Sequence, residues 1–112
     1  MTKNEFAVVL ITTSADEESQ LIARVLLEQK KAACVNIVPE VTSLFWWEKA
    51  VNRDRESLLI VKTKVELLDE VIRLVKEIHS YDVPEIIALP ILGGNNDYLE
   101  WIDNEVAPEE AD

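Results

Sequence analysis

Three short segments of this sequence, residues 6–11, 58–61 and 86–91, are apolar at odd and even positions alike. Side chains on a β-strand alternate between the two faces of its sheet, so each segment predicts a strand that is apolar on both faces. The sheet that contains these strands must therefore be covered on both sides. This requirement constrains the fold more than any other feature of the sequence.

Two segments between these strands have the periodicity of amphipathic helices. Residues 16–30 predict a helix with acidic side chains early and with Lys30 and Lys31 at its end, as the helix dipole favours. A second helix is predicted to end at about residue 78. The Ser-x-x-Glu and Thr-x-x-Glu spacings at residues 14–17 and 63–66 predict a capping box before each helix. The apolar side chains predicted to face the core are Leu21, Ile22, Val25 and Leu26 in the first helix, and Val65, Leu68, Ile72 and Val75 in the second.

The remaining segments complete the order βαββαβ followed by a short helix. Residues 33–38 predict a strand that can continue to residue 47, and residues 48–56 are predicted to be a polar turn. Residues 84–91 form the fourth predicted strand, and a short helix with Tyr98, Leu99, Trp101 and Ile102 follows the turn Gly93-Gly94-Asn95-Asn96. This order is typical of the α+β class, as a ferredoxin-like βαββαβ sandwich with an additional short C-terminal helix.

The second face of the predicted sheet has no cover within the chain. A chain of 112 residues fits one domain, so we expect residues 1–112 to form a single domain with residues 107–112 as a frayed acidic tail. Two helices cover only one face of a four-stranded sheet. We therefore expect an obligate homo-oligomer that buries the other face.

The charge of the chain excludes one class of partner. It has 22 acidic and 11 basic side chains, for a formal charge of −11, which repels a polyphosphate backbone. We expect no nucleic acid partner. The first apolar segment is too short for a signal peptide or a membrane span, and a single cysteine agrees with a reducing compartment. We therefore expect a cytoplasmic protein without a membrane partner.

Few side chains are suited to metal or nucleophilic chemistry. His79 is the only histidine and Cys34 the only cysteine. Imidazole and thiolate are both ligands for copper, so His79 and Cys34 are the candidate metal ligands, with Asp82 or Glu85 as a weaker ligand or supporting group. The structural alternatives are a histidine that stabilises a helix end and a cysteine that packs as a small apolar side chain.

Other motifs indicate packing rather than catalysis. Neighbouring side chains on a strand point to opposite faces, so we expect one indole of Phe45-Trp46-Trp47 to face the core and the other a subunit partner. No protease-type local sequence surrounds Cys34, and no acid/base pair stands out among the many carboxylates. We expect that the protein is not an enzyme.

Several motifs, in the right order, closely resemble the CutA divalent-cation tolerance family. These motifs are Ala32-Ala33-Cys34-Val35-Asn36-Ile37, Ser43-Leu44-Phe45-Trp46-Trp47-Glu48, Leu58-Leu59-Ile60-Val61-Lys62-Thr63, His79-Ser80-Tyr81-Asp82-Val83-Pro84-Glu85-Ile86 and Tyr98-Leu99-Glu100-Trp101. The resemblance implies a ferredoxin-like fold, a homotrimer with inward-facing sheets, a cytoplasmic location and a role in tolerance to divalent ions. It also implies copper or another divalent metal ion as the bound group and no organic cofactor.

The sequence departs from the family pattern near the candidate site. Trp47-Glu48-Lys49-Ala50 lacks the glycine of Trp-x-Gly-Lys, so we expect a reshaped turn. His79-Ser80-Tyr81-Asp82 stands where relatives have His-Pro-Tyr-Glu. Ile11, Leu74 and Ile78 stand where some relatives carry further Cys or His residues, so water, a carboxylate or a neighbouring subunit would have to complete a copper site.

Two functions follow from the resemblance. The first is a non-enzymatic trimer that binds divalent metal and contributes to metal homeostasis. The second is a signalling module, because CutA trimers resemble the nitrogen-regulatory PII proteins, which implies a small metabolite in clefts between subunits. The candidate cleft residues are Lys62, Tyr81, Glu85, Tyr98 and Trp101. An acylphosphatase-like enzyme ranks last, because Thr12-Thr13-Ser14-Ala15 provides neither the glycine nor the arginine of a phosphate loop.

Overall fold

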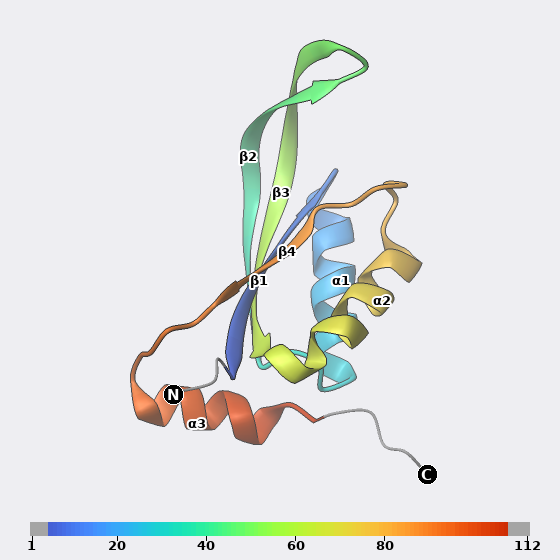
Figure 1. Ribbon diagram of the computed structural model, residues 1–112. Helices are drawn as coiled ribbons and strands as arrows, with labels where there is room; N and C mark the ends of the chain where they lie inside the picture. The colour runs from blue at the N-terminus through green and yellow to red at the C-terminus, as the bar shows by residue number, and fades with distance from the viewer. Residues whose placement is uncertain (1–4, 108–112) are drawn as a thin grey trace.

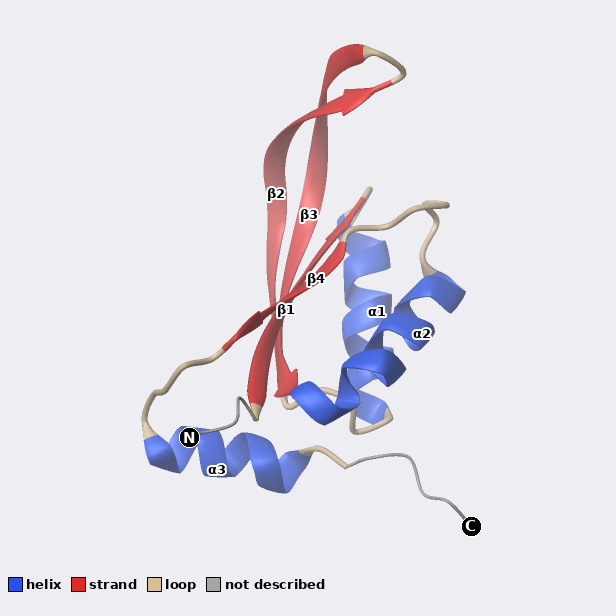
Figure 2. Cartoon of the chain, viewed as in Figure 1, coloured by secondary structure: helices blue, strands red, loops and turns tan. Residues whose placement is uncertain are grey.

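A computed structural model describes residues 5–107 of the chain. Its elements, in chain order, are β1 (Phe6–Thr13), α1 (Asp16–Glu28), β2 (Cys34–Trp47), β3 (Ala50–Lys64), a 3-10 turn η1 (Val65–Leu67), α2 (Leu68–Ile78), β4 (Ile86–Pro90) and α3 (Asn96–Glu105). The predicted α+β class, with the order βαββαβ and an additional C-terminal helix, is confirmed (Figure 2). The predicted frayed tail lies outside the described residues, apart from Ala107.

The four strands form one antiparallel sheet in the order β2-β3-β1-β4, and α1 and α2 lie together on one face of it (Figure 1). Between the helices and the sheet lies the hydrophobic core. Burial of each large apolar side chain there stabilises the fold by roughly 1.5–3 kcal/mol. The core includes Val9 and Ile11 of β1, Leu59 and Val61 of β3, Ile22 and Leu26 of α1, and Val71 and Val75 of α2.

The face of the sheet that the helices leave uncovered is also apolar. We call it the open sheet face, and its apolar side chains include Val8, Leu10, Val38, Ile60, Ile87 and Leu89. Leu89 pairs with Val8 and Ile87 pairs with Leu10, so the apolar side chains of β1 and β4 lie side by side on it. As the sequence predicted, α1 and α2 cover only one face.

The strands β2 and β3 extend beyond the helices as a long hairpin, which we call the arm (residues 41–56; Figure 1). The prediction of a polar turn over residues 48–56 is therefore wrong. Trp47 pairs with Ala50, so the turn contains only Glu48 and Lys49. The strand residues 50–56 are polar because the arm extends beyond the core, and hydrophobic periodicity could not reveal a strand there.

The two tryptophans of the arm do not face the core. Trp46 is 74% exposed and Trp47 is 60% exposed, so the expected packing of one indole in the core is wrong. Both lie on the part of β2 that has no helix above it. The other half of that prediction, an indole against a subunit partner, stays a prediction.

Neither predicted capping box is present among the described residues. The residue before α1 is Ala15, and no side chain within residues 5–107 caps α1 or η1. The Ser14 hydroxyl donates to Glu18 at 3.4 Å, and the Thr63 hydroxyl donates to the Lys31 carbonyl at 2.6 Å. A tertiary partner has replaced the predicted local one for Thr63.

The predicted buried faces of the helices are partly corrected. Leu21 and Val65 are exposed, whereas Val25, Leu68 and Ile72 are half-buried. The second helix begins one turn later than the apolar pattern predicted, because residues 65–67 form a 3-10 turn that rotates the buried stripe. The side chains that are buried instead are Ser19 and Ala23 in α1, Leu67 in η1, and Val71 and Leu74 in α2.

Replacing Lys49 by glycine is expected to raise the free energy of unfolding by about 0.5–1 kcal/mol. Glu48 and Lys49 have φ angles of 50° and 67°, in the left-handed region that favours glycine in a two-residue hairpin turn. Urea unfolding would measure the change. The matched control is Ala50→Gly in the adjacent strand, which is expected to lower stability; equal losses in both variants would contradict strain at Lys49.

Candidate functional site

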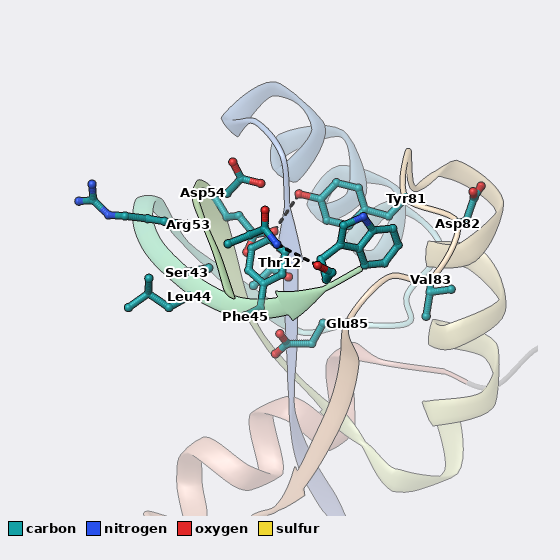
Figure 3. A pocket seen from close by; sticks show the side chains of 13 residues that line it. Thr12, Ser43, Leu44, Phe45, Arg53, Asp54, Tyr81, Asp82, Val83 and Glu85 are labelled. Carbon is teal, nitrogen blue, oxygen red and sulfur yellow. Dashed lines mark hydrogen bonds between the residues drawn. The ribbon is translucent and has the colours of Figure 1, made fainter. Parts of the chain in front are cut away.

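A cavity of about 740 Å³ opens between the arm and the loop that joins α2 to β4 (Figure 3). Thr12, near the end of β1, also lines it. Its lining residues on the arm are Ser43, Leu44, Phe45, Trp47, Asn52, Arg53, Asp54 and Glu56, and those on the loop are Tyr81, Asp82, Val83 and Glu85. The sequence predicted two of these residues, Tyr81 and Glu85, as part of a binding cleft.

Tyr81 connects the loop to the arm. Its hydroxyl donates to Glu56 Oε2 at 2.8 Å, one of the bonds drawn in Figure 3. Burial raises the pKa of the Tyr81 phenol above its usual range, and the bond to Glu56 and the nearby carboxylates Asp54 and Glu18 raise it further. At neutral pH, Tyr81 is therefore a neutral donor that closes one wall of an acidic cavity.

The cavity is lined by more negative than positive side chains. Asp54, Glu56, Asp82 and Glu85 contribute carboxylates, and Arg53 contributes the one guanidinium among the lining residues. In Figure 3, Arg53 extends away from Tyr81, and the labelled carboxylates point in different directions. The lining thus attracts cations, but its carboxylates do not converge on one point.

The described side chains of one subunit do not form a complete set of metal ligands in this cavity. Within residues 5–107, no group of three or more His, Cys, Asp or Glu side chains could hold a metal ion. A hydrated divalent cation, however, binds through one or two carboxylates and keeps several of its waters. The cavity carboxylates fit that mode, which needs no closed coordination shell from a single chain.

His79 lies directly after α2, and its side chain has no exposed surface. The Tyr81 N–H donates to Nδ1 at 3.0 Å, so the ring proton is on Nε2, which lies 2.7 Å from the Thr12 carbonyl oxygen and donates to it. Both ring nitrogens therefore bind the backbone. Ligation of a metal by His79 stays a prediction, and it would require the ring to leave one of these partners.

Glu18 of α1 is a further residue of the site, and the sequence analysis did not identify it. Its carboxylate accepts hydrogen bonds from the Ser80 N–H at 2.6 Å and the Ser80 hydroxyl at 3.1 Å, and lies 3.8 Å from His79 Nδ1. Burial acts to raise the pKa of Glu18, but the bonds from Ser80, together with His79 and Ser14, lower it overall. Ser80 is 62 residues away from Glu18 along the chain, so no local pattern could have revealed this partner.

Glu18→Gln is expected to reduce stability at pH 7 by roughly 1.5–2 kcal/mol, because hydrogen bonds to a charged group are lost. The lowered pKa means that the ionised carboxylate favours folding. This contribution is complete above the ordinary pKa of 4.5 and is lost as the pH falls through the folded-state pKa. Urea unfolding between about pH 7 and about pH 3 should show the variant and the parent converging in acid; parallel curves would contradict the role.

Cys34 lies in a different part of the molecule from His79. It is half-buried, pairs with Lys62 across β2 and β3, and has its Sγ 4.0 Å from Asn36 Oδ1. This pairing places Cys34 on the open sheet face, whereas His79 ends a helix that covers the opposite face. One subunit therefore does not bring the two candidate ligands onto the same metal ion.

The five candidate cleft residues fall into two groups within one chain. Tyr81 and Glu85 line the cavity. The rings of Tyr98 and Trp101 lie 5.4 Å apart on α3, and burial and neighbouring Cys34 raise the pKa of Tyr98. Lys62 is six residues beyond Glu56 on β3, roughly 20 Å away from the Tyr81 contact. A cleft that unites all five would need a second subunit, and it stays a prediction.

Comparison with known proteins gives consistent similarities. The family model of the CutA1 divalent ion tolerance protein matches residues 7–105. The relative named Protein CutA 1, chloroplastic, from Oryza sativa subsp. japonica is 52% identical over 97 residues, which are 87% of this chain but 55% of that protein. The chain thus spans about half the length of this relative. The Divalent-cation tolerance protein CutA from Thermus thermophilus is 48% identical over 95 residues, 85% of this chain and 92% of that protein.

The fold is likewise that of a solved structure. The crystal structure of CutA1 from Oryza sativa superposes with a TM-score of 0.91 at 47% identity, covering 97% of this chain and 100% of the other. None of the helices within residues 5–107 is long and apolar enough to cross a membrane. Because the rice relative is named as chloroplastic, the expected cytoplasmic location stays a prediction.

Proposed function

Because this chain belongs to the CutA1 divalent ion tolerance family, we propose that it is a non-enzymatic homotrimer that binds copper or another divalent cation and contributes to metal tolerance. The observation that carries the proposal is the cavity beside Tyr81. It has four carboxylates and one guanidinium among its lining residues. A hydrated divalent cation is the ligand that such a surface attracts.

The open sheet face supports the oligomeric part of the proposal. Ile87 and Leu89 are half-exposed there, next to the apolar side chains of β1. An apolar face of this kind on a single chain is a typical interface between subunits. The number of subunits follows from the family resemblance, and so does the copper.

In this proposal, the cavity carboxylates are the main ligands of the cation. His79 and Cys34 remain candidate copper ligands, since imidazole and thiolate bind copper more strongly than carboxylate does. They lie on opposite sides of the sheet, so they would serve separate ions or receive their remaining ligands from a neighbouring subunit.

Native mass spectrometry during a Cu²⁺ titration tests subunit number and metal stoichiometry together. We expect a trimer that takes up a fixed number of ions. The variant Asp54→Asn with Glu85→Gln should lose most of this uptake. Its matched control, Glu100→Gln with Glu105→Gln, makes the same change of charge on α3, outside the cavity, and should retain the uptake. Uptake that does not saturate and is equal in both variants would indicate only general attraction to an acidic surface and would contradict the proposal.

The second candidate function is the binding of a small metabolite between subunits. It is favoured by the grouping of Tyr98 beside Cys34, with Lys62 paired to Cys34 in the sheet. Aromatic rings beside an amino group suit an anionic ring compound. A thermal shift screen against nucleotides and organic acids separates the two functions, because a nucleotide response without a metal response would favour the metabolite.

A further inference from the structure

We propose that His79 is a positioning residue, whose buried ring holds Tyr81 in place against Glu56 at the wall of the cavity. This role differs from both roles that the sequence predicted for His79, a metal ligand and a partner of the helix dipole. The positioning of Tyr81 by His79 does not depend on the proposed function. Only its expected effect on cation binding rests on that function.

The imidazole is fixed to the sheet on one side and to the loop on the other. Its Nε2–H donates to the Thr12 carbonyl of β1 at 2.7 Å, and its Nδ1 accepts from the Tyr81 N–H at 3.0 Å. The chain leaves α2 at this residue with φ −74° and ψ 138°. The ring thus supplies the acceptor for the Tyr81 amide directly after the helix ends.

The imidazole also contacts the side chain that it positions. The rings of His79 and Tyr81 lie 4.8 Å apart and are tilted by 51°. The Tyr81 hydroxyl then reaches Glu56 at 2.8 Å. Backbone, ring and hydroxyl of Tyr81 are therefore each held, and two of these three contacts are to His79.

Glu18 holds Ser80, the residue between His79 and Tyr81, in place. Its carboxylate binds both the N–H and the hydroxyl of Ser80. Three successive residues, His79, Ser80 and Tyr81, are thus anchored to β1, α1 and β3 respectively. A segment held at three successive residues has a defined shape, and it sets the position of Tyr81 at the cavity wall for a cation or any other ligand.

Three substitutions of His79 test the roles of its two ring nitrogens separately. His79→Asn keeps an acceptor near the position of Nδ1, His79→Gln keeps a donor near the position of Nε2, and His79→Ala keeps neither. Amide hydrogen exchange followed by NMR reports the position of Tyr81 directly. We expect faster exchange of the Tyr81 amide in His79→Ala and restored protection in His79→Asn. The control is the Ala33 amide, which donates to the Lys62 carbonyl at 2.9 Å, and its exchange rate should not change.

The NMR result decides the proposal whether or not the protein binds metal. Unchanged exchange of the Tyr81 amide in His79→Ala would overturn it. So would failure of His79→Asn to protect that amide better than His79→Ala does. Thermal unfolding of each variant shows that the fold is retained. If His79→Ala does not fold, His79→Gln replaces it, because glutamine lacks the acceptor near Nδ1 and should also give faster exchange of the Tyr81 amide.

Mn²⁺ affinity tests the consequence for the site, because Mn²⁺ prefers oxygen ligands and gains little from imidazole. We expect His79→Ala and Tyr81→Phe each to weaken Mn²⁺ binding roughly tenfold, and the double variant to be no weaker than Tyr81→Phe alone. If the double variant loses the sum of the two single losses of Mn²⁺ affinity, the proposal that His79 acts through Tyr81 is overturned. Absence of saturable Mn²⁺ and Cu²⁺ binding in the parent protein would instead overturn the proposed function and leave the NMR result standing.

Discussion

Lys31→Met is expected to lower the free energy of unfolding by about 3 kcal/mol. Lys31 Nζ lies 2.7 Å from Glu70 Oε1, and the two side chains are only 6% and 23% exposed. The ammonium group also donates to the Ala107 carbonyl at 3.3 Å. Methionine has a similar length but no charge, so the substitution takes the cation from a carboxylate that is mostly buried.

The reason for so large an effect is the number of segments that meet at Lys31. The residue follows α1, Glu70 belongs to α2, and Ala107 follows α3. The Ala107 N–H also donates to the Lys30 carbonyl at 2.9 Å. Loss of the ammonium therefore weakens the contact between the two covering helices and the end of the third.

Lys30→Met provides the matched control. Lys30 is adjacent and exposed, so the same loss of charge and gain of a thioether should change stability by less than about 0.5 kcal/mol. Urea unfolding at one fixed protein concentration measures both variants, since the stability of an oligomer depends on concentration. Glu70→Gln in the Lys31→Met background should recover part of the loss. Equal stability of the two lysine variants would refute the buried pair.

The sequence predicted the order of the elements but not the partners of their polar side chains. Apolar side chains located β1, α1 and β4 because one face of each packs in or against the core. Lys31 was interpreted as a partner of the helix dipole, whereas its ion pair is with a residue 39 positions later. Likewise, Thr12 binds His79 across 67 positions. Contacts at such separation depend on the packing of the helices on the sheet, and no local spacing encodes them.

Local sequence patterns also failed to predict the strands of the arm and the residues at the helix N-termini. Residues 50–56 have no apolar alternation because the arm extends past the core, so their strand character depends on pairing with β2. The Thr63 hydroxyl had a local partner available in a capping box, but it binds the Lys31 carbonyl, where it satisfies a buried group. Most of the candidate cavity is built by this arm, and therefore the sequence revealed only its loop side.

Leu89→Lys is expected to convert the proposed homotrimer into monomers. Leu89 lies on the open sheet face opposite Val8 and is 50% exposed in the single chain. Burial of an unpaired ammonium group at an apolar interface costs several kcal/mol, and a trimer would contain three such groups. The substitution should leave the core intact, because Leu89 does not point toward α1 and α2.

Leu21→Lys makes the same substitution at a matched position. Leu21 is 51% exposed and lies on α1, on the opposite side of the sheet. Light scattering at several protein concentrations should give a trimer for this variant and a monomer for Leu89→Lys. A trimer in both would place the interface elsewhere than on the open sheet face, while a monomer in Leu21→Lys would assign it to the helices. Since the open sheet face has adjacent apolar strands without a cover from α1 and α2, and the surface around Leu21 is on a helix, we expect the dissociation to be specific to Leu89.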